Sequence, residues 1–142
     1  MKKRKIIIIA GMLICLFCVI GVYEYISVGR NSNFKISQLN WNGETKFWTD
    51  NTHKNVYDIK FQIFDGVDLK EITSGKSTYT MKIVSTVEEG DLKIKVYNDK
   101  NILFQQSGTT NKIFTVLNKD SKNVKVEITG KKARGRIKIE LT

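Results

Sequence analysis

The sequence predicts an all-β fold, an antiparallel β-sandwich of seven to nine strands with a jelly-roll-like arrangement, preceded by a single N-terminal transmembrane helix. Three observations predict it. Apolar residues recur at every second position in several segments after residue 28. Turn-forming residues separate those segments, and an uncharged apolar run occupies residues 6–23. Of the 142 residues, roughly 110 remain for one domain with a single core.

The N-terminal apolar run is long enough to cross a bilayer as a helix. Four cations precede it within residues 1–5, so we expect that basic segment to be cytoplasmic. Residues 24–33 then form a tether, and residues 34–142 an extracytoplasmic β-sandwich domain at the cell membrane. The alternative is a signal peptide cleaved near residues 19–21, which would release a secreted protein.

Both cysteines lie inside the apolar run. Cys15 follows Ile14 and Cys18 follows Phe17, whereas a lipid-modified cysteine normally follows a small residue, so lipidation is the lesser alternative. A membrane span offers neither solvent access nor further ligands for a metal or redox pair. The exported domain therefore has no cysteine and is expected to fold without disulfides.

The strands are predicted from odd-even alternation of apolar and polar residues. The clearest segments are Tyr57–Ile63, Tyr79–Ile83, Leu92–Val96, Val124–Ile128 and Ile137–Leu141, with shorter candidates at Phe34–Leu39, Ile102–Gln106 and Ile113–Leu117. Such alternation buries one face of a strand and leaves the other in water, which is typical of antiparallel sheets.

Turn-forming residues lie between these segments. They occur at Asp65-Gly66, Ser74-Gly75, Glu89-Gly90-Asp91, Asn98–Asn101, Ser107-Gly108 and Thr129-Gly130. Each is predicted to separate two strands, and Asn98–Asn101 to close a hairpin. Because the chain has no proline, lysines or bulges are expected to protect the edge strands.

The segment from Tyr79 to Leu103 combines a strand, a Gly90-Asp91 turn, an alternating strand ending in Val96-Tyr97, and a short polar loop. It resembles the central strands of small jelly-roll modules of bacterial secreted proteins, among them pre-peptidase C-terminal domains. The sequence departs from that pattern in lacking an acidic companion after Gly90-Asp91 and an attached peptidase. The resemblance implies a β-sandwich with an accessory or adhesive role, and transfers no functional residue.

No set of residues predicts catalysis, a metal or another cofactor. His53 is the single histidine and lies in a polar loop, where we expect an exposed surface side chain. No Gly-x-Ser-x-Gly elbow or histidine pair occurs. Acidic residues gather at predicted turns, near residues 65–68 and 88–91, without the rhythm of a calcium loop. We therefore expect that the protein is not an enzyme.

Trp41 and Trp48 are the first candidate binding residues. They stand among amide and hydroxyl side chains, a mixture that can stack on a sugar ring and hydrogen-bond to it. The alternative is that both indoles cover an end of the sandwich, because each buries a large area.

Lys131, Lys132, Arg134 and Arg136 are the second candidate. They are predicted to form a basic hairpin between two strands, within a domain that has 20 Lys and Arg against 13 Asp and Glu over residues 29–142. Such a hairpin could bind phosphate-rich polymers or anionic lipid headgroups; the alternative is a solvated charged turn. Nucleic acid is disfavoured as a partner because the domain is expected outside the cell.

These features together predict a non-enzymatic binding or accessory module for an envelope protein or an anionic surface polymer. The alternative function is a carbohydrate-binding module that uses Trp41 and Trp48.

Overall fold

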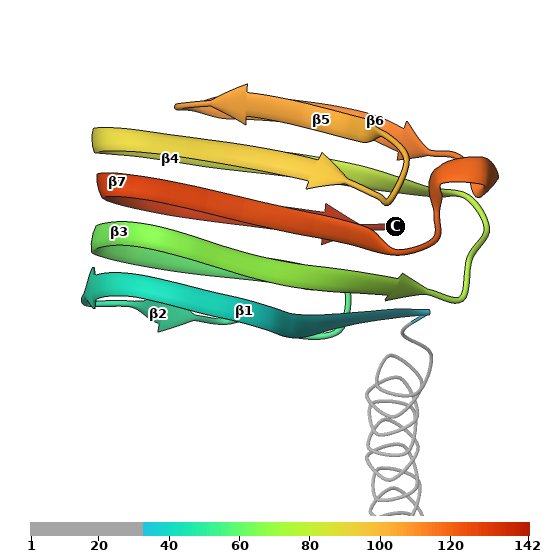
Figure 1. Cartoon of the computed structure of the whole chain (residues 1–142), viewed down its shortest axis with the longest axis horizontal. Coiled ribbons are helices and arrows are strands. Elements are labelled where there is room, and N and C mark those ends of the chain that lie inside the picture. Colours follow the sequence, from blue (N-terminus) through green and yellow to red (C-terminus); the bar gives the residue numbers. More distant parts are fainter. Residues whose placement is uncertain (1–32) are drawn as a thin grey trace, which may run out of the picture. The chain divides into compact units, whose positions relative to one another are not determined.

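The computed structural model describes residues 33–142, which form one antiparallel β-structure (Figure 1). Its seven strands are β1 (Phe34–Lys46), β2 (Thr49–Asp50), β3 (Val56–Ser74), β4 (Tyr79–Tyr97), β5 (Ile102–Ser107), β6 (Thr110–Val116) and β7 (Val124–Leu141). A single 3-10 turn, η1 (Asn118–Asp120), precedes β7. The strand order is β1-β3-β7-β4-β5, with β2 paired to β3 and β6 paired to β4.

The predicted basic segment 1–5, the predicted span 6–23 and residues 24–32 of the predicted tether lie outside the described residues. From residue 33 onward, no helix has the length and apolar character needed to cross a bilayer.

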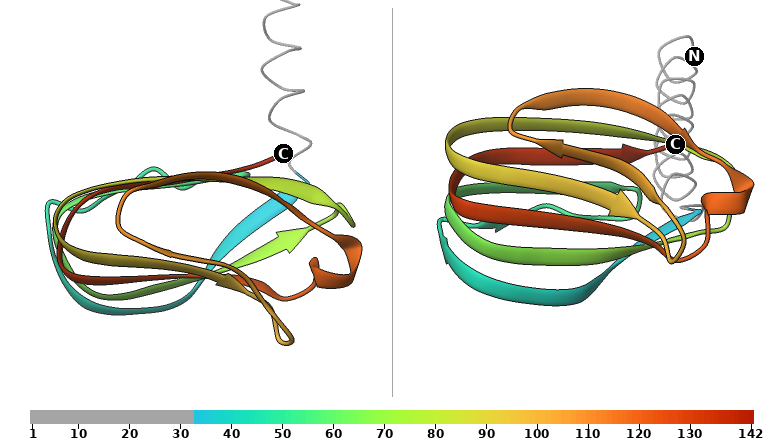
Figure 2. Two further views of the ribbon diagram at one scale, coloured as in Figure 1. Left: turned by 90° about the horizontal axis from the view of Figure 1, so that it is seen from above. Right: turned by 45° about the horizontal axis from the view of Figure 1, so that its top comes forward.

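The strands β3, β4 and β7, of 18 or 19 residues each, bend in the middle and fold back over themselves (Figure 2). They stay paired along their whole length: Tyr57, near the start of β3, pairs with Ile139, whereas Ile72, near its end, pairs with Val124. Each strand therefore contributes one half to each of two layers. The first layer contains β2, β6, the first halves of β3 and β4 and the second half of β7. The second contains β1, β5 and the remaining halves.

Three of the predicted turns are bends within strands. Asp65-Gly66, Glu89-Gly90-Asp91 and Thr129-Gly130 lie inside continuous strands and do not separate strands. Register shifts occur on both sides of Glu89 and on both sides of Phe64, and a bulge of this kind bends a strand without ending its pairing. The prediction was wrong because glycine and acidic residues suit a bulged bend as well as a tight turn.

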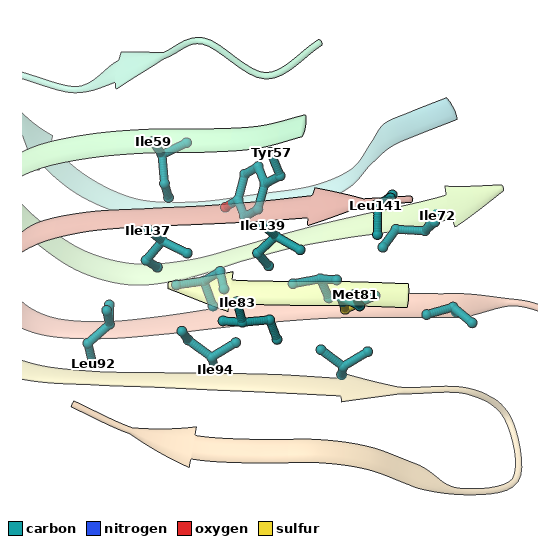
Figure 3. Close-up of a cluster of buried hydrophobic side chains, with 14 of the residues drawn as sticks. Tyr57, Ile59, Ile72, Met81, Ile83, Leu92, Ile94, Ile137, Ile139 and Leu141 are labelled. Atoms are coloured by element: carbon teal, nitrogen blue, oxygen red, sulfur yellow. The ribbon is translucent and has the colours of Figure 1, made fainter. Parts of the chain in front are cut away.

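Alternating side chains meet between the two layers and form the core (Figure 3). Ile59, Ile83, Ile137 and Ile139 come from the first layer, and Ile94 comes from the second. The predicted alternation is therefore confirmed at these positions. It is wrong for Ile63, which is 37% exposed, because the bulge in β3 places Phe64 in the core instead. At the edge formed by β5 and β6, the rings of Phe104 and Phe114 stack with centroids 5.6 Å apart and close the sandwich.

The sandwich has two different ends. At the bend end, β3, β4 and β7 turn from one layer into the other. The loop end consists of residues 74–78, 98–101 and 117–123 together with Asn33, where the described chain begins. There the Gly75 N–H donates to the Asn33 carbonyl (2.7 Å), and the predicted hairpin at Asn98–Asn101 joins β4 to β5.

Candidate functional site

The edge opposite Phe104 and Phe114 is formed by β1 in one layer and β2 in the other. We call it the open edge, because β1 and β2 each pair only with β3 and have no strand on their outer side. On β1, Gln38 pairs with Lys70, and Trp41 pairs with Asp68 after a bulge. Asp50 of β2 pairs with the buried Ile59 and so shares its inward face. Both edge strands therefore direct a mixture of aromatic and polar side chains toward the gap between the layers.

Trp41, on β1, and Trp48, in the link between β1 and β2, contact each other at this edge, with ring centroids 5.7 Å apart. Trp48 stacks on Phe61 (5.8 Å, 21°) and meets the edge of Phe64 at 5.3 Å. Trp48 is therefore part of the packing, as the structural alternative predicted. Trp41 also contacts Phe64, at 5.9 Å, but keeps 38% of its surface exposed.

A buried polar cluster lies beside the tryptophans at the same edge. The fully buried Asp68 carboxylate accepts hydrogen bonds from the Tyr57 hydroxyl and the Gln38 amide, both at 2.6 Å. The Lys70 ammonium donates to Gln38 Oε1 at 2.6 Å and to Asp50 at 3.3 Å, and lies 3.8 Å from Asp68. The cluster therefore links the two layers through charge-assisted hydrogen bonds.

Two groups of the cluster have shifted pKa values. Burial raises the pKa of Tyr57 well above its ordinary value, and the neighbouring Asp68 charge raises it further. Burial also works to raise the pKa of Asp50, but the hydrogen bonds from Thr52 and the positive charge of Lys70 outweigh it and lower that pKa. At neutral pH Asp50 is therefore ionised and the buried Tyr57 is neutral.

The four predicted basic residues lie at the bend of β7 and not in a hairpin. Arg134 pairs with Glu88 at 2.8 Å, and Arg136 forms two hydrogen bonds with Asp58, at 2.7 and 2.9 Å. Lys131 and Lys132 are exposed and have no ion pair with any described residue. The structure therefore divides the predicted basic patch, because acidic residues of β3 and β4 neutralise its two arginines.

The Asp58–Arg136 pair predicts a dependence of stability on pH. The hydrogen bonds and charge of Arg136 lower the pKa of Asp58, so the stabilisation is complete above the ordinary carboxyl pKa of 3.8 and is lost as pH falls through the lower folded value. Arg136→Gln should cost about 0.5–1 kcal/mol at pH 7, because the arginine is half-exposed. Urea unfolding at pH 7 and pH 3 checks this. A cost that persists undiminished at the lower pH would contradict the role of the ion pair.

His53 lies in the loop before β3 and is exposed, with ring Nδ1 2.8 Å from the Asn51 carbonyl. Its predicted surface position is confirmed. Across residues 33–142, no three His, Cys, Asp or Glu side chains are grouped so as to hold a metal ion.

The fold and its open edge define residues 33–142 as a β-sandwich module. No family model and no curated protein matches the chain. Among solved structures, TmCBM61 in complex with β-1,4-galactotriose is similar with a TM-score of 0.40 and 14% identity, covering 82% of this chain and 92% of that one.

A family 29 carbohydrate-binding module is similar with a TM-score of 0.37 and 14% identity, covering 76% and 86% of the two chains. The secreted serine protease VesC from Vibrio cholerae is similar with a TM-score of 0.43 and 13% identity, covering 65% of this chain, which spans only 22% of VesC. At these values the similarities assign neither a family nor a ligand. The resemblance to pre-peptidase C-terminal domains stays a prediction.

Proposed function

We propose that this protein is a membrane-anchored, non-enzymatic module that binds a glycan outside the cell through its open edge. The observation that carries the proposal is Trp41, whose ring is held against Trp48 and Phe64 and yet remains 38% exposed beside polar side chains. The apolar run at residues 6–23, after four cations, supports the anchor and its orientation.

The edge provides both kinds of contact that a sugar needs. An exposed indole face stacks on the apolar face of a pyranose ring, while groups at its rim bond to hydroxyls. Gln38 and Asp50 lie exposed on the same edge, and both are hydrogen-bonded within the polar cluster. The Asp50 carboxylate accepts one hydrogen bond at each oxygen, from the Thr52 N–H and from Lys70, so its remaining lone pairs can accept from a sugar hydroxyl. Trp48 holds the platform in place because it is fixed between Trp41 and Phe61.

Two features favour binding over catalysis at this edge. Asp68 is fully buried, and both of its carboxylate oxygens already accept hydrogen bonds from Tyr57 and Gln38. The lowered pKa of Asp50 keeps that carboxylate ionised at neutral pH, so it has no proton to donate as a general acid. The cluster therefore offers neither an unengaged Asp68 carboxylate nor a protonated Asp50 as a general acid.

The glycan proposal is preferred over the anionic polymer because of the charges at the bend. Arg134 and Arg136 have acidic partners, which leaves Lys131 and Lys132 as the two cations of that group without one among the described residues. Two exposed lysines give a weak and salt-sensitive attraction.

Trp41→Ala should reduce glycan affinity by about 10-fold to 100-fold, because a well-placed aromatic anchor contributes ~1.5 to 3 kcal/mol. The substitution should leave the fold intact, since Trp41 is exposed and at an edge. Trp48→Ala should instead lower the unfolding free energy by about 3 kcal/mol, because Trp48 packs on Phe61 and Phe64. Titration calorimetry with a panel of cell-surface glycans and urea unfolding measure the two effects.

Lys131→Glu/Lys132→Glu is the matched control. If the double substitution leaves glycan affinity unchanged and Trp41→Ala reduces it, glycan binding at the open edge is supported. Binding that survives Trp41→Ala, but is lost with the double substitution and weakens steeply with salt, would replace the glycan by an anionic polymer bound at the bend.

A further inference from the structure

We propose that the loop end of the sandwich docks on the surface of an anionic lipid bilayer, so that the open edge is held in a defined orientation. This inference rests on the membrane anchor in the proposed function. It is carried by three observations on the described residues: the charge of the loops, two exposed apolar side chains among them, and the point at which the chain joins the sandwich.

The first observation is the excess of lysine in the three loops. Lys76, Lys100, Lys119 and Lys122 are all exposed, against two acidic residues in the same loops. Asp99 accepts hydrogen bonds from Asn123 at 2.6 Å and from Lys125 at 3.2 Å, so a further cation from β7 offsets its charge. The loop end therefore has a positive field, and such a field is attracted to anionic headgroups within a Debye length of about 8–10 Å.

The second observation is that large apolar side chains are exposed beside these lysines. Ile102 is 60% exposed and Leu117 is 49% exposed. Asn101, next to Ile102, donates to the Asp120 carboxylate at 3.1 Å, and the Asp120 N–H donates to the Leu117 carbonyl at 2.8 Å, so these bonds hold the two loops together. A rigid tip that combines apolar side chains with lysines suits the interface between headgroups and acyl chains.

The third observation is where the tether is attached. The Gly75 N–H bonds to the Asn33 carbonyl, so the chain enters the sandwich at the loop end. A tether of the predicted length, residues 24–33, spans at most about 35 Å when fully extended. The bend end lies roughly 30 Å further along, the length of a nine-residue half-strand. For the bend end to meet the lipid, the tether would have to lie almost fully extended along the sandwich, whereas the loop end can meet the lipid without such extension. The point of attachment therefore favours the loop end as the part that meets the lipid.

This geometry also separates two groups of cations. Lys131 and Lys132, for which lipid headgroups were one predicted partner, lie at the bend end, far from Asn33. Lysines that the sequence did not single out lie at the loop end. Charge reversals at the two ends are therefore matched in size and differ in position.

The test uses the full chain in nanodiscs of phosphatidylcholine, with or without phosphatidylglycerol, and hydrogen-deuterium exchange read by mass spectrometry. In anionic nanodiscs, we expect exchange in residues 98–102 and 117–123 to be at least about threefold slower than in neutral ones. Exchange at the bend, in residues 86–91, should be the same in both. Lys119→Glu/Lys122→Glu should restore the faster exchange, whereas Lys131→Glu/Lys132→Glu should not.

Equal exchange of the wild-type loops in the two nanodiscs would overturn the inference. Alkaline carbonate extraction of cell membranes separates that failure from failure of the anchor. A chain that stays in the membrane pellet but shows equal exchange loses only the docking surface. A chain that appears in the supernatant loses both the anchor and the docking surface. In either case glycan binding is measured independently with the Trp41 variant.

Discussion

Gly90→Ala is expected to lower the unfolding free energy by about 3 kcal/mol or more, because it disrupts the bend that joins the two layers. Gly90 has φ +72°, a conformation that L side chains rarely adopt. A Cβ atom there would lie 2.2 Å from the Lys132 carbonyl oxygen and 2.5 Å from its carbon. Both atoms belong to the backbone of the neighbouring β7, so relief requires the two strands to separate.

Gly108→Ala is the matched control. Gly108 has φ +78°, close to that of Gly90, but an added Cβ would meet nothing within 4 Å. It should therefore cost only the backbone strain, about 1 kcal/mol. Urea unfolding followed by circular dichroism measures both variants. Equal losses would mean that the close approach of β4 and β7 at the bend does not contribute to stability.

Asp68→Ala is expected to lower the unfolding free energy by about 3 to 5 kcal/mol, the cost of removing one partner of a buried ion pair. The substitution leaves the buried Tyr57 hydroxyl without its acceptor. It also removes the fully buried counter-charge that lies 3.8 Å from the Lys70 ammonium. Asp99→Ala removes an exposed ion pair with Lys125 and should cost far less, because solvent screens a pair at the surface. Guanidinium unfolding at pH 7 compares the two.

The double substitution Asp68→Leu/Lys70→Met tests whether the two charges are coupled. Removing both charges should recover part of the loss caused by Asp68→Leu alone, because no uncompensated ion then remains buried. Losses that simply add would show that Asp68 and Lys70 act independently and that the polar cluster is not one unit.

The predicted site was recovered in part. Trp41 and Trp48 could be named from the sequence because large aromatics stood among amides and hydroxyls. Asp68 and Lys70 could not, because the apolar residues beside them, Val67 and Leu69, suggest the opposite face as the buried one. The bulge in the middle of β3 reverses which positions point inward: Ile59 and Phe61 are buried before it, and Asp68 and Lys70 after it.

The sequence by itself determined the all-β character of the domain and the core side chains on either side of the bulges, because alternation fixes which residues share a face of an extended strand. The sequence also contains a pattern that indicates the bends. In β4, the buried residues have odd residue numbers around Ile83 and even residue numbers around Ile94. In β7, they have even residue numbers around Ile128 and odd residue numbers around Ile137. One inserted residue explains each change, so a continuous bulged strand was readable there as an alternative to two strands and a turn.

Only the tertiary structure decided which side chains of different strands contact one another. Trp41 lies on β1 and Trp48 in the link between β1 and β2. Trp48 contacts Trp41 and also Phe61 and Phe64 because β3 folds back and carries its two partner strands, β1 and β2, to the same edge. The same folding brings Asp50 to Lys70, whereas Arg136 reaches Asp58 across the pairing of β3 with β7 within one layer. Such contacts depend on strand register and on the position of each bulge, which are set by packing across the whole sandwich and not by any local pattern of residues.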